Sequence, residues 1–324
     1  MYFAALLGGV CALILGLYIL YKLAAPPRSK PKIPISVNYH FTRRCNYSCG
    51  FCFHTATTSY VEPLPNAKRG LALLKKAGMK KLNFAGGEPF LEPVFLGELA
   101  KYCKEVLRLE SVSVVTNGSK VTDRWLSKYG QYLDIIAVSC DSFNEETNIS
   151  IGRGQGAHLK SVTKLSQLCR SHGIKFKVNT VVNRYNLHED MHAPIRAIAP
   201  FRWKCFQVLI VEGENDSATT KTNAHRFTIT PGEFEAFCDA HSDLECLVPE
   251  PNDVMRSSYL LLDEYMRFLN KGVGEPTRPI LEIGVHDALE HVEWDQVGFK
   301  KRGGVYDWTR DAGSEREVDP SLEF

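Results

Sequence analysis

The sequence predicts an α/β fold built on a parallel sheet. Two observations predict it: short β-rich runs recur between residues 35 and 211, and one segment of helical period separates each run from the next. The predicted strands are Ile35–Phe41, Lys80–Ala85, Val112–Thr116, Asp134–Ser139, Lys175–Val182 and Cys205–Val211. Six β/α units with right-handed crossovers form either an open twisted sheet or an incomplete (β/α) barrel. In both folds, ligands bind at the carboxyl ends of the strands.

The predicted helices begin and end at ordinary signals. Pro65 opens an amphipathic run that Gly78 closes, and a second helix, His158–His172, ends at a glycine. Beyond residue 213 the alternation weakens, and the polar stretch 215–223 is predicted to be a loop. The spacing of apolar residues predicts one more helix over Ser257–Asn270.

Composition indicates a globular protein without a strong electrostatic field. The chain has 324 residues, 44% of them hydrophobic and 23% charged, which allows one large domain or two small ones. Its formal net charge of +2 gives no long-range attraction for nucleic acid. Direct nucleic-acid binding is therefore not expected, and an anionic partner must be bound by a local site.

The cysteines fall into two groups. Seven lie scattered among mostly apolar neighbours and are predicted to be buried free thiols: Cys11, Cys103, Cys140, Cys169, Cys205, Cys238 and Cys246. The other three lie within eight residues of one another, at Cys45, Cys49 and Cys52. Such spacing is typical of a metal site in a reducing compartment.

The amino-terminal residues predict a membrane anchor. Residues 2–21 carry no charged side chain, and about 20 apolar residues span the hydrocarbon core of a bilayer. A cleavable signal peptide is the alternative, but no positive charge precedes the apolar run. Lys22, Arg28, Lys30 and Lys32 follow the run, so the rest of the chain is expected in the cytosol.

The chain divides into five predicted parts. Residues 1–23 form the anchor, and residues 24–33 form a linker rich in proline and basic side chains. Residues 34–212 form the β/α domain, and residues 213–310 form a carboxyl-terminal extension that completes the substrate site. Residues 311–324 are mostly polar and are expected to be a flexible tail.

The three clustered cysteines follow the first predicted strand and can converge on one metal centre. A structural zinc site needs a fourth ligand, which His54 could supply. A ferredoxin-type cluster needs four cysteines, but the next one is Cys103, beyond a whole β/α unit. Three thiolates on an iron–sulfur cluster leave one iron open to bind a small molecule.

The pattern C-x₃-C-x₂-C, with Phe53 directly after it, resembles the signature of the radical S-adenosylmethionine (SAM) superfamily. The resemblance implies a partial (β/α)₆ barrel, a [4Fe–4S] cluster whose open iron binds SAM, and formation of a 5′-deoxyadenosyl radical. The segment Gly86-Gly87-Glu88-Pro89 follows the second strand and resembles the family's segment for the SAM amino group. Matching to the family implies these cofactor-binding residues: Phe51, Phe53, Gly86, Gly87, Glu88, Asn117, Ser139 and Arg153.

Several longer segments resemble the viperin family of antiviral radical SAM enzymes. They include residues 36–43, 49–54, 83–90, 139–143, 151–156 and 263–270, and the likeness spans Pro34 to Trp308. It implies conversion of CTP to 3′-deoxy-3′,4′-didehydro-CTP by removal of the ribose C4′ hydrogen and loss of the 3′-hydroxyl as water. UTP or GTP remains open as the substrate.

The same matching implies the substrate site. The nucleotide-binding residues would be Asn38, His40, Lys81, Asn83, Lys177, Asn179, Lys204, Lys301 and Arg302. Tyr259 would pass hydrogen or a proton to the substrate radical. No P-loop is present, so the triphosphate depends on these lysines and on Arg302.

The resemblance also implies a location and a partner. It places the protein at the endoplasmic reticulum membrane or on lipid droplets, facing the cytosol, although this anchor is more uniformly apolar than the family's amphipathic helix. Leu322-Glu323-Phe324 resembles a terminal tripeptide through which the family engages the cytosolic iron–sulfur assembly machinery. Two alternatives remain: an enzyme similar to the GTP cyclase of molybdenum cofactor synthesis, which would need a second cluster site, and a membrane-anchored iron–sulfur scaffold without turnover.

Overall fold

The computed structural model describes residues 32–271, 274–301 and 303–310. The fold below is that of the compact unit that begins at Ile33. The predicted anchor and tail, nearly all of the predicted linker, and Arg302 lie outside the described residues. Within the described ranges, no helix has the length and apolar character needed to cross a bilayer.

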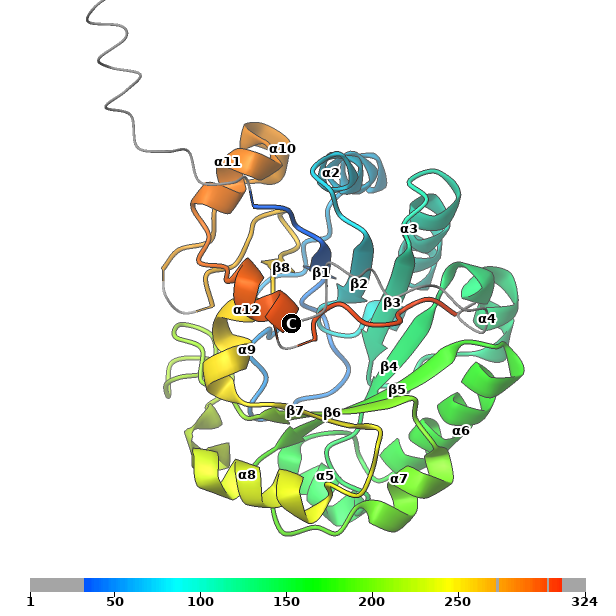
Figure 1. Cartoon of the computed structure of the whole chain (residues 1–324), viewed down its shortest axis with the longest axis vertical. Helices are drawn as coiled ribbons and strands as arrows, with labels where there is room; N and C mark the ends of the chain where they lie inside the picture. The colour runs from blue at the N-terminus through cyan, green and yellow to red at the C-terminus, as the bar shows by residue number, and fades with distance from the viewer. Residues whose placement is uncertain (1–31, 272–273, 302, 311–324) are drawn as a thin grey trace, which may run out of the picture. The chain divides into compact units, whose positions relative to one another are not determined.

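A curled parallel sheet organises the unit (Figure 1). In the described residues it has eight strands in the order β7-β6-β5-β4-β3-β2-β1-β8, so the seven consecutive strands β1 to β7 lie side by side. The strands are β1 (Ser36–His40), β2 (Lys81–Ala85), β3 (Ser111–Thr116), β4 (Ile135–Ser139), β5 (Lys175–Val182), β6 (Arg202–Gln207), β7 (Leu247–Glu250) and β8 (Leu261–Leu262). This order confirms the predicted β/α succession, and the curl shows the incomplete barrel.

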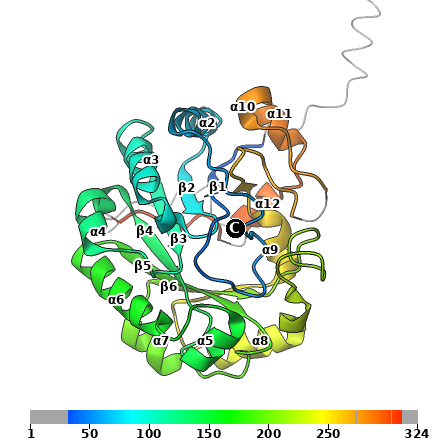
Figure 2. The same cartoon turned by 180° about the vertical axis from the view of Figure 1, so that it is seen from behind.

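Helices cover the convex face of the sheet (Figures 1 and 2). Those between the strands are α2 (Leu64–Lys76), α3 (Pro93–Glu105), α4 (Asp123–Tyr129), α5 (Glu145–Ile151), α6 (His158–Ser171), α7 (His192–Ile198) and α8 (Pro231–Ala240). The later ones are α9 (Asn252–Ser258), α10 (Ile280–Ile283), α11 (Val285–Glu290) and α12 (Gln296–Lys301). Leu71, Leu74, Leu96 and Leu99 are fully buried, so α2 and α3 contribute large side chains to the core.

Period-two alternation decides which strand residues face the cavity. Along β5 the side chains alternate: Phe176 and Val178 are buried in the core, whereas Lys177 and Asn179 are half-buried and line the cavity. The alternation along β5 therefore directs the side chains of Lys177 and Asn179 into the cavity.

The helix predicted over Ser257–Asn270 is not present in the structure. Residues 257–270 contain only the end of α9, the short β8 beside β1, and a turn. The carboxylate of Asp263 accepts hydrogen bonds from the backbone N–H groups of Tyr265 and Arg267, and Met266 has a positive φ of 61°. A side-chain-capped turn and pairing with β1 override the helical period of the apolar residues.

Residues 303–310 lie across the amino-terminal side of several strands, where Figure 1 shows them crossing the sheet. The Ser111 hydroxyl, at the start of β3, donates to the Trp308 carbonyl at 2.8 Å. Lys175, at the start of β5, forms an ion pair with Asp307 at 2.7 Å. This segment closes the end of the half-barrel opposite the carboxyl ends of the strands.

Candidate active site

A cavity of about 360 Å³ lies inside the half-barrel. Its lining includes side chains of β1 to β6, the loop after β1 that carries the three cysteines, and the late residues Tyr259, Phe299 and Tyr306. Sequence segments more than 200 residues apart thus line the same cavity.

The cysteine loop is held by backbone hydrogen bonds to the end of α5. Ser48 N–H donates to the Gly152 carbonyl at 3.1 Å, and Gly50 N–H donates to the Ile151 carbonyl at 2.9 Å. Cys45, Cys49 and Cys52 all line the cavity, and no disulfide involves them. Burial raises the pKa of the Cys49 thiol to about 12, and Arg153 opposes this rise.

Outside this loop, the described cysteines confirm the predicted free thiols. Cys103, Cys140, Cys169, Cys205 and Cys238 are buried, and Cys246 is half-buried. Cys11 lies outside the described residues.

The Gly-Gly-Glu-Pro segment packs directly on the backbone before Cys45. Gly87 N–H donates to the Thr42 carbonyl and Glu88 N–H to the Arg44 carbonyl, each at 2.7 Å. A Cβ at position 87 would lie 2.0 Å from the Arg44 carbonyl oxygen, so only glycine allows this approach. The end of β2 thereby fixes the first residues of the cysteine loop.

The side chain of Glu88, which the family resemblance assigns to cofactor binding, lies outside the cavity lining. Its side chain is fully buried and does not line the cavity. Its carboxylate accepts hydrogen bonds from the Thr116 hydroxyl at 2.6 Å, the Asn117 N–H at 2.7 Å and the Phe90 N–H at 3.0 Å. Glu88 therefore joins the ends of β2 and β3 and orients Asn117.

The other predicted cofactor residues border the cavity, namely Phe51, Phe53, Gly86, Gly87, Asn117, Ser139 and Arg153. Arg153 is buried beside the carboxylate of Asp141, which accepts a hydrogen bond from its Nε. Sequence reasoning missed Asp141, although its position just beyond the carboxyl end of β4 was the available signal.

A polar ladder crosses three strands on the cavity face. Asn83 Nδ2 donates to Asn38 Oδ1 at 2.8 Å, and the Ser113 hydroxyl donates to Asn83 Oδ1 at 2.8 Å. These residues are register neighbours on β1, β2 and β3. Burial lowers the pKa of nearby His40 to about 3, so its imidazole is neutral at physiological pH.

Lys81, Lys177 and Lys204 line the cavity from β2, β5 and β6. Burial lowers the pKa of Lys81 to about 7, with Asp134 opposing and Lys204 adding to the effect. Burial also lowers the pKa of Lys177, and Lys204 and Lys81 lower it further. The ammonium groups lower one another's pKa, so a bound polyanion would favour their protonated forms.

Tyr259 and Glu250 lie beside Lys204. The Lys204 ammonium donates to the Tyr259 hydroxyl at 2.9 Å and pairs with the Glu250 carboxylate. The Tyr259 hydroxyl in turn donates to Glu250 at 2.9 Å. Glu250 is buried at the end of the unpredicted strand β7, and nothing in the sequence around it signals a site residue.

Two predicted substrate residues are not placed at the cavity. Lys301 ends α12, is exposed and does not line the cavity. Arg302 lies outside the described residues. Tyr306, which sequence reasoning missed, does line the cavity, and its hydroxyl lies 3.4 Å from the Lys81 ammonium.

Residues 39–193 match the model of the radical SAM superfamily. A zebrafish (Danio rerio) protein named S-adenosylmethionine-dependent nucleotide dehydratase RSAD2 is 53% identical over 283 residues, covering 86% of this chain and 79% of its own. The chain belongs to the S-adenosylmethionine-dependent nucleotide dehydratase family. This assignment confirms the resemblance to viperin that the motifs predicted.

One further member of this dehydratase family is more distant. A Lacinutrix mariniflava dehydratase is 38% identical over 310 residues, covering 90% of this chain and 62% of its own. Among solved structures, Streptococcus suis SuiB bound to S-adenosylmethionine has a TM-score of 0.61 at 16% identity, covering 83% of this chain and 68% of its own. The latter likeness shows the fold alone.

This dehydratase is therefore a radical SAM enzyme whose cofactors are a [4Fe–4S] cluster and S-adenosylmethionine. A single tetrahedral zinc ion would hold its thiolates about 4 Å apart. Among the described residues, the metal-ligand atoms that gather within 4.8 Å belong to Asp190, His192 and His241, not to the cysteines. The predicted alternative of a zinc site completed by His54 is thus disfavoured.

Proposed function

We propose that the enzyme converts CTP to 3′-deoxy-3′,4′-didehydro-CTP, an antiviral chain terminator. The observation that carries the proposal is that Lys81, Lys177 and Lys204 line the same cavity as the three cysteines. A nucleoside triphosphate is the class of nucleotide that several buried cations would bind most tightly. CTP is preferred over UTP and GTP because of the resemblance to viperin.

The reaction balances as a dehydration. When bound, the reduced cluster and SAM would supply a 5′-deoxyadenosyl radical able to take the C4′ hydrogen atom of the ribose. The C3′–O bond then breaks, a proton joins the leaving hydroxyl to give water, and one electron from an external low-potential donor completes the C3′=C4′ double bond.

The chain's own residues would hold the two ends of the substrate. The lysines would neutralise the triphosphate, and the Asn38–Asn83–Ser113 ladder offers amide and hydroxyl groups to the ribose or the base. Tyr259 would be the hydrogen or proton donor, with its hydroxyl held between Lys204 and Glu250. The enclosure by Phe299 and Tyr306 would exclude water from the radical.

An anaerobic assay tests the substrate and the reacting position. Full-length, cluster-loaded protein is given SAM, dithionite and each of the four nucleoside triphosphates, and 5′-deoxyadenosine is measured. We expect CTP to stimulate its formation most, and CTP deuterated at C4′ to transfer the label. A larger response to UTP or GTP would refute the base assignment alone, whereas label arriving from C3′ or C5′ would refute the mechanism.

We also propose that residues 1–23 anchor the protein in the endoplasmic reticulum membrane with the catalytic unit in the cytosol. The uncharged run of residues 2–21 and the basic residues after it support this orientation. In sealed microsomes, added protease should digest the catalytic unit. Protection of the catalytic unit from the protease would mean that the unit faces the lumen and that the proposed orientation is wrong.

The terminal residues 322–324 are proposed to recruit the cytosolic iron–sulfur assembly machinery. A hydrophobe, an acid and an aromatic in succession offer both an apolar and a charged contact. Deleting them should lower the iron content of protein made in eukaryotic cells, and chemical reconstitution should restore activity. Equal iron content with and without them would refute this proposal.

A further inference from the structure

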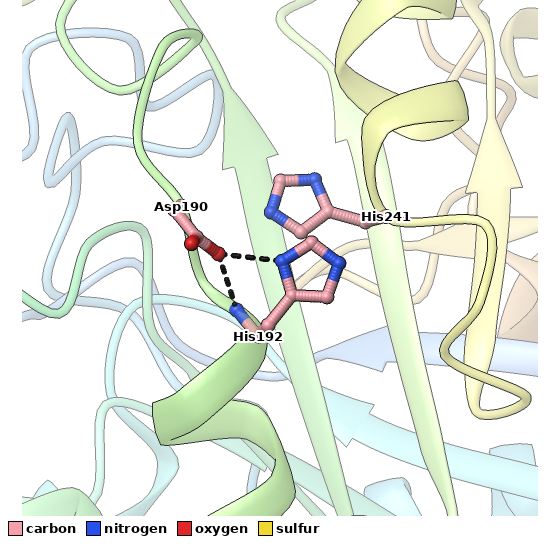
Figure 3. Close-up of side chains that lie close together, drawn as sticks. All are labelled: Asp190, His192 and His241. Atoms are coloured by element: carbon pink, nitrogen blue, oxygen red, sulfur yellow. Dashed lines mark hydrogen bonds and ion pairs between the residues drawn. The ribbon is translucent and has the colours of Figure 1, made fainter.

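A second group of metal-ligating side chains lies away from the cavity. A carboxylate oxygen of Asp190 and ring nitrogens of His192 and His241 lie within 4.8 Å of one another (Figure 3). Asp190 and His192 lie at the start of α7, and His241 ends α8. None of the three lines the cavity, so this group is separate from the cluster and its substrate.

Each histidine has a hydrogen-bond acceptor beside the ring nitrogen that faces away from the group. His241 Nδ1 lies 2.8 Å from the Phe237 carbonyl, which only accepts, so Nδ1 carries the hydrogen and the lone pair is on Nε2. His192 Nε2 lies 2.8 Å from the Asp243 carboxylate, which fixes a hydrogen there in the same way. Metal-binding histidines typically donate their second N–H to a carbonyl or a carboxylate in this manner.

The space between His192 and Asp190 requires a cation. With its hydrogen on Nε2, His192 presents the Nδ1 lone pair to Asp190 Oδ1 at 2.5 Å. Two lone pairs repel at that distance, so a proton lies between them, and a metal ion that replaced this proton would hold the two atoms about 3 Å apart.

We propose that Asp190, His192 and His241 form a divalent transition-metal site of the Zn²⁺ type. Two imidazoles and one carboxylate are a common zinc ligand set, and a water molecule can take the fourth position because Asp190 is exposed. The ion would displace the Met191 N–H from His241 Nε2, which it approaches at 3.0 Å, and the proton from His192. It would join the start of α7 to the end of α8.

Zinc binding to the cluster-loaded, full-length protein tests the site. Protein is dialysed anaerobically against buffered free Zn²⁺, and zinc and iron are both measured by mass spectrometry. We expect one zinc per chain with iron unchanged, and loss of that zinc in His192→Ala and Asp190→Asn. Asp243→Asn removes the carboxylate that supports His192 and also pairs with Arg196, and it should weaken zinc binding about 10- to 100-fold.

His172→Ala is the matched control. His172 pairs with Asp123 at 2.7 Å, but no third ligand atom joins them within the described residues. This variant should keep its zinc, and zinc should raise the melting temperature of the control and of wild type but not of His192→Ala. Unchanged zinc content in His192→Ala and Asp190→Asn would overturn the proposal, as would zinc uptake that displaces iron, or no uptake by wild type.

Discussion

The cysteine loop and the lysine-lined part of the cavity are built in different ways. The loop takes its three cysteines from eight consecutive residues, fixed by backbone hydrogen bonds to α5 and to the Gly-Gly-Glu-Pro segment. The lysines come from three strands, and only the parallel register brings them together. A short motif can therefore specify the cofactor site, whereas the substrate site depends on the whole sheet.

The largest effect is expected at the cysteine loop. Cys49→Ala should abolish the visible absorbance of the cluster and all SAM cleavage, because two thiolates cannot hold the cluster. Cys246→Ala removes a half-buried thiol away from the cavity and should preserve both properties. Absorbance spectra and 5′-deoxyadenosine formation measure the outcome. Cleavage retained by Cys49→Ala would refute the ligand assignment.

The second effect concerns the backbone that supports the loop. Gly87→Ala forces a Cβ against the Arg44 carbonyl, and such overpacking costs about 1–3 kcal/mol. We expect lower cluster occupancy and a lower melting temperature. The control is Gly232→Ala, where a Cβ meets no atom within 4 Å and φ is not positive. Equal iron content in the two variants would show that the close approach does not matter.

The third prediction tests whether the substrate site can be changed without changing the cofactor site. Lys177→Ala removes one cation from the substrate site, and a hydrogen bond to a charged group contributes about 1.5–3 kcal/mol, so nucleotide affinity should fall about 10- to 100-fold. Iron content and nucleotide-independent SAM cleavage should not change. Lys164→Ala, at an exposed position on α6, is the control. Loss of the cluster in Lys177→Ala would mean that the two regions fold as one.

The sequence predicts regular parts of the fold better than tertiary exceptions. The predicted strand Lys175–Val182 matches β5, because an alternating pattern with β-branched residues needs no distant partner. The sixth predicted strand begins at Cys205, three residues after the start of β6. The reason is that the charged residues Arg202 and Lys204 do not fit the pattern of an apolar strand. The helix expected over Ser257–Asn270 fails because β8 pairs with β1 and Asp263 caps a turn.

Site residues follow the same rule. Cys45 to Cys52 form a motif, but Glu250 and Tyr306 belong to none, and only the folded chain brings them to Lys204 and Lys81. Glu88 belongs to a motif, but its carboxylate accepts three buried hydrogen bonds. A motif therefore predicts where a residue lies in the fold, but not which groups its side chain contacts.

The smallest expected effect is a pH dependence of nucleotide binding. In the protein without nucleotide, burial lowers the pKa of Lys81 to about 7, so Lys81 loses its proton as the pH rises above neutrality, and burial lowers the pKa of Lys177 as well. A triphosphate binds the protonated ammonium groups and raises their pKa, so binding above pH 7 must take up protons. CTP affinity should therefore fall severalfold between pH 7 and pH 8.5. Calorimetric titrations in buffers of different ionisation enthalpy count the protons directly: we expect net uptake at pH 8 in wild type and less in Lys177→Ala. Proton release, or uptake unchanged by that substitution, would mean that the lysines are already charged and that their number, not their burial, governs binding.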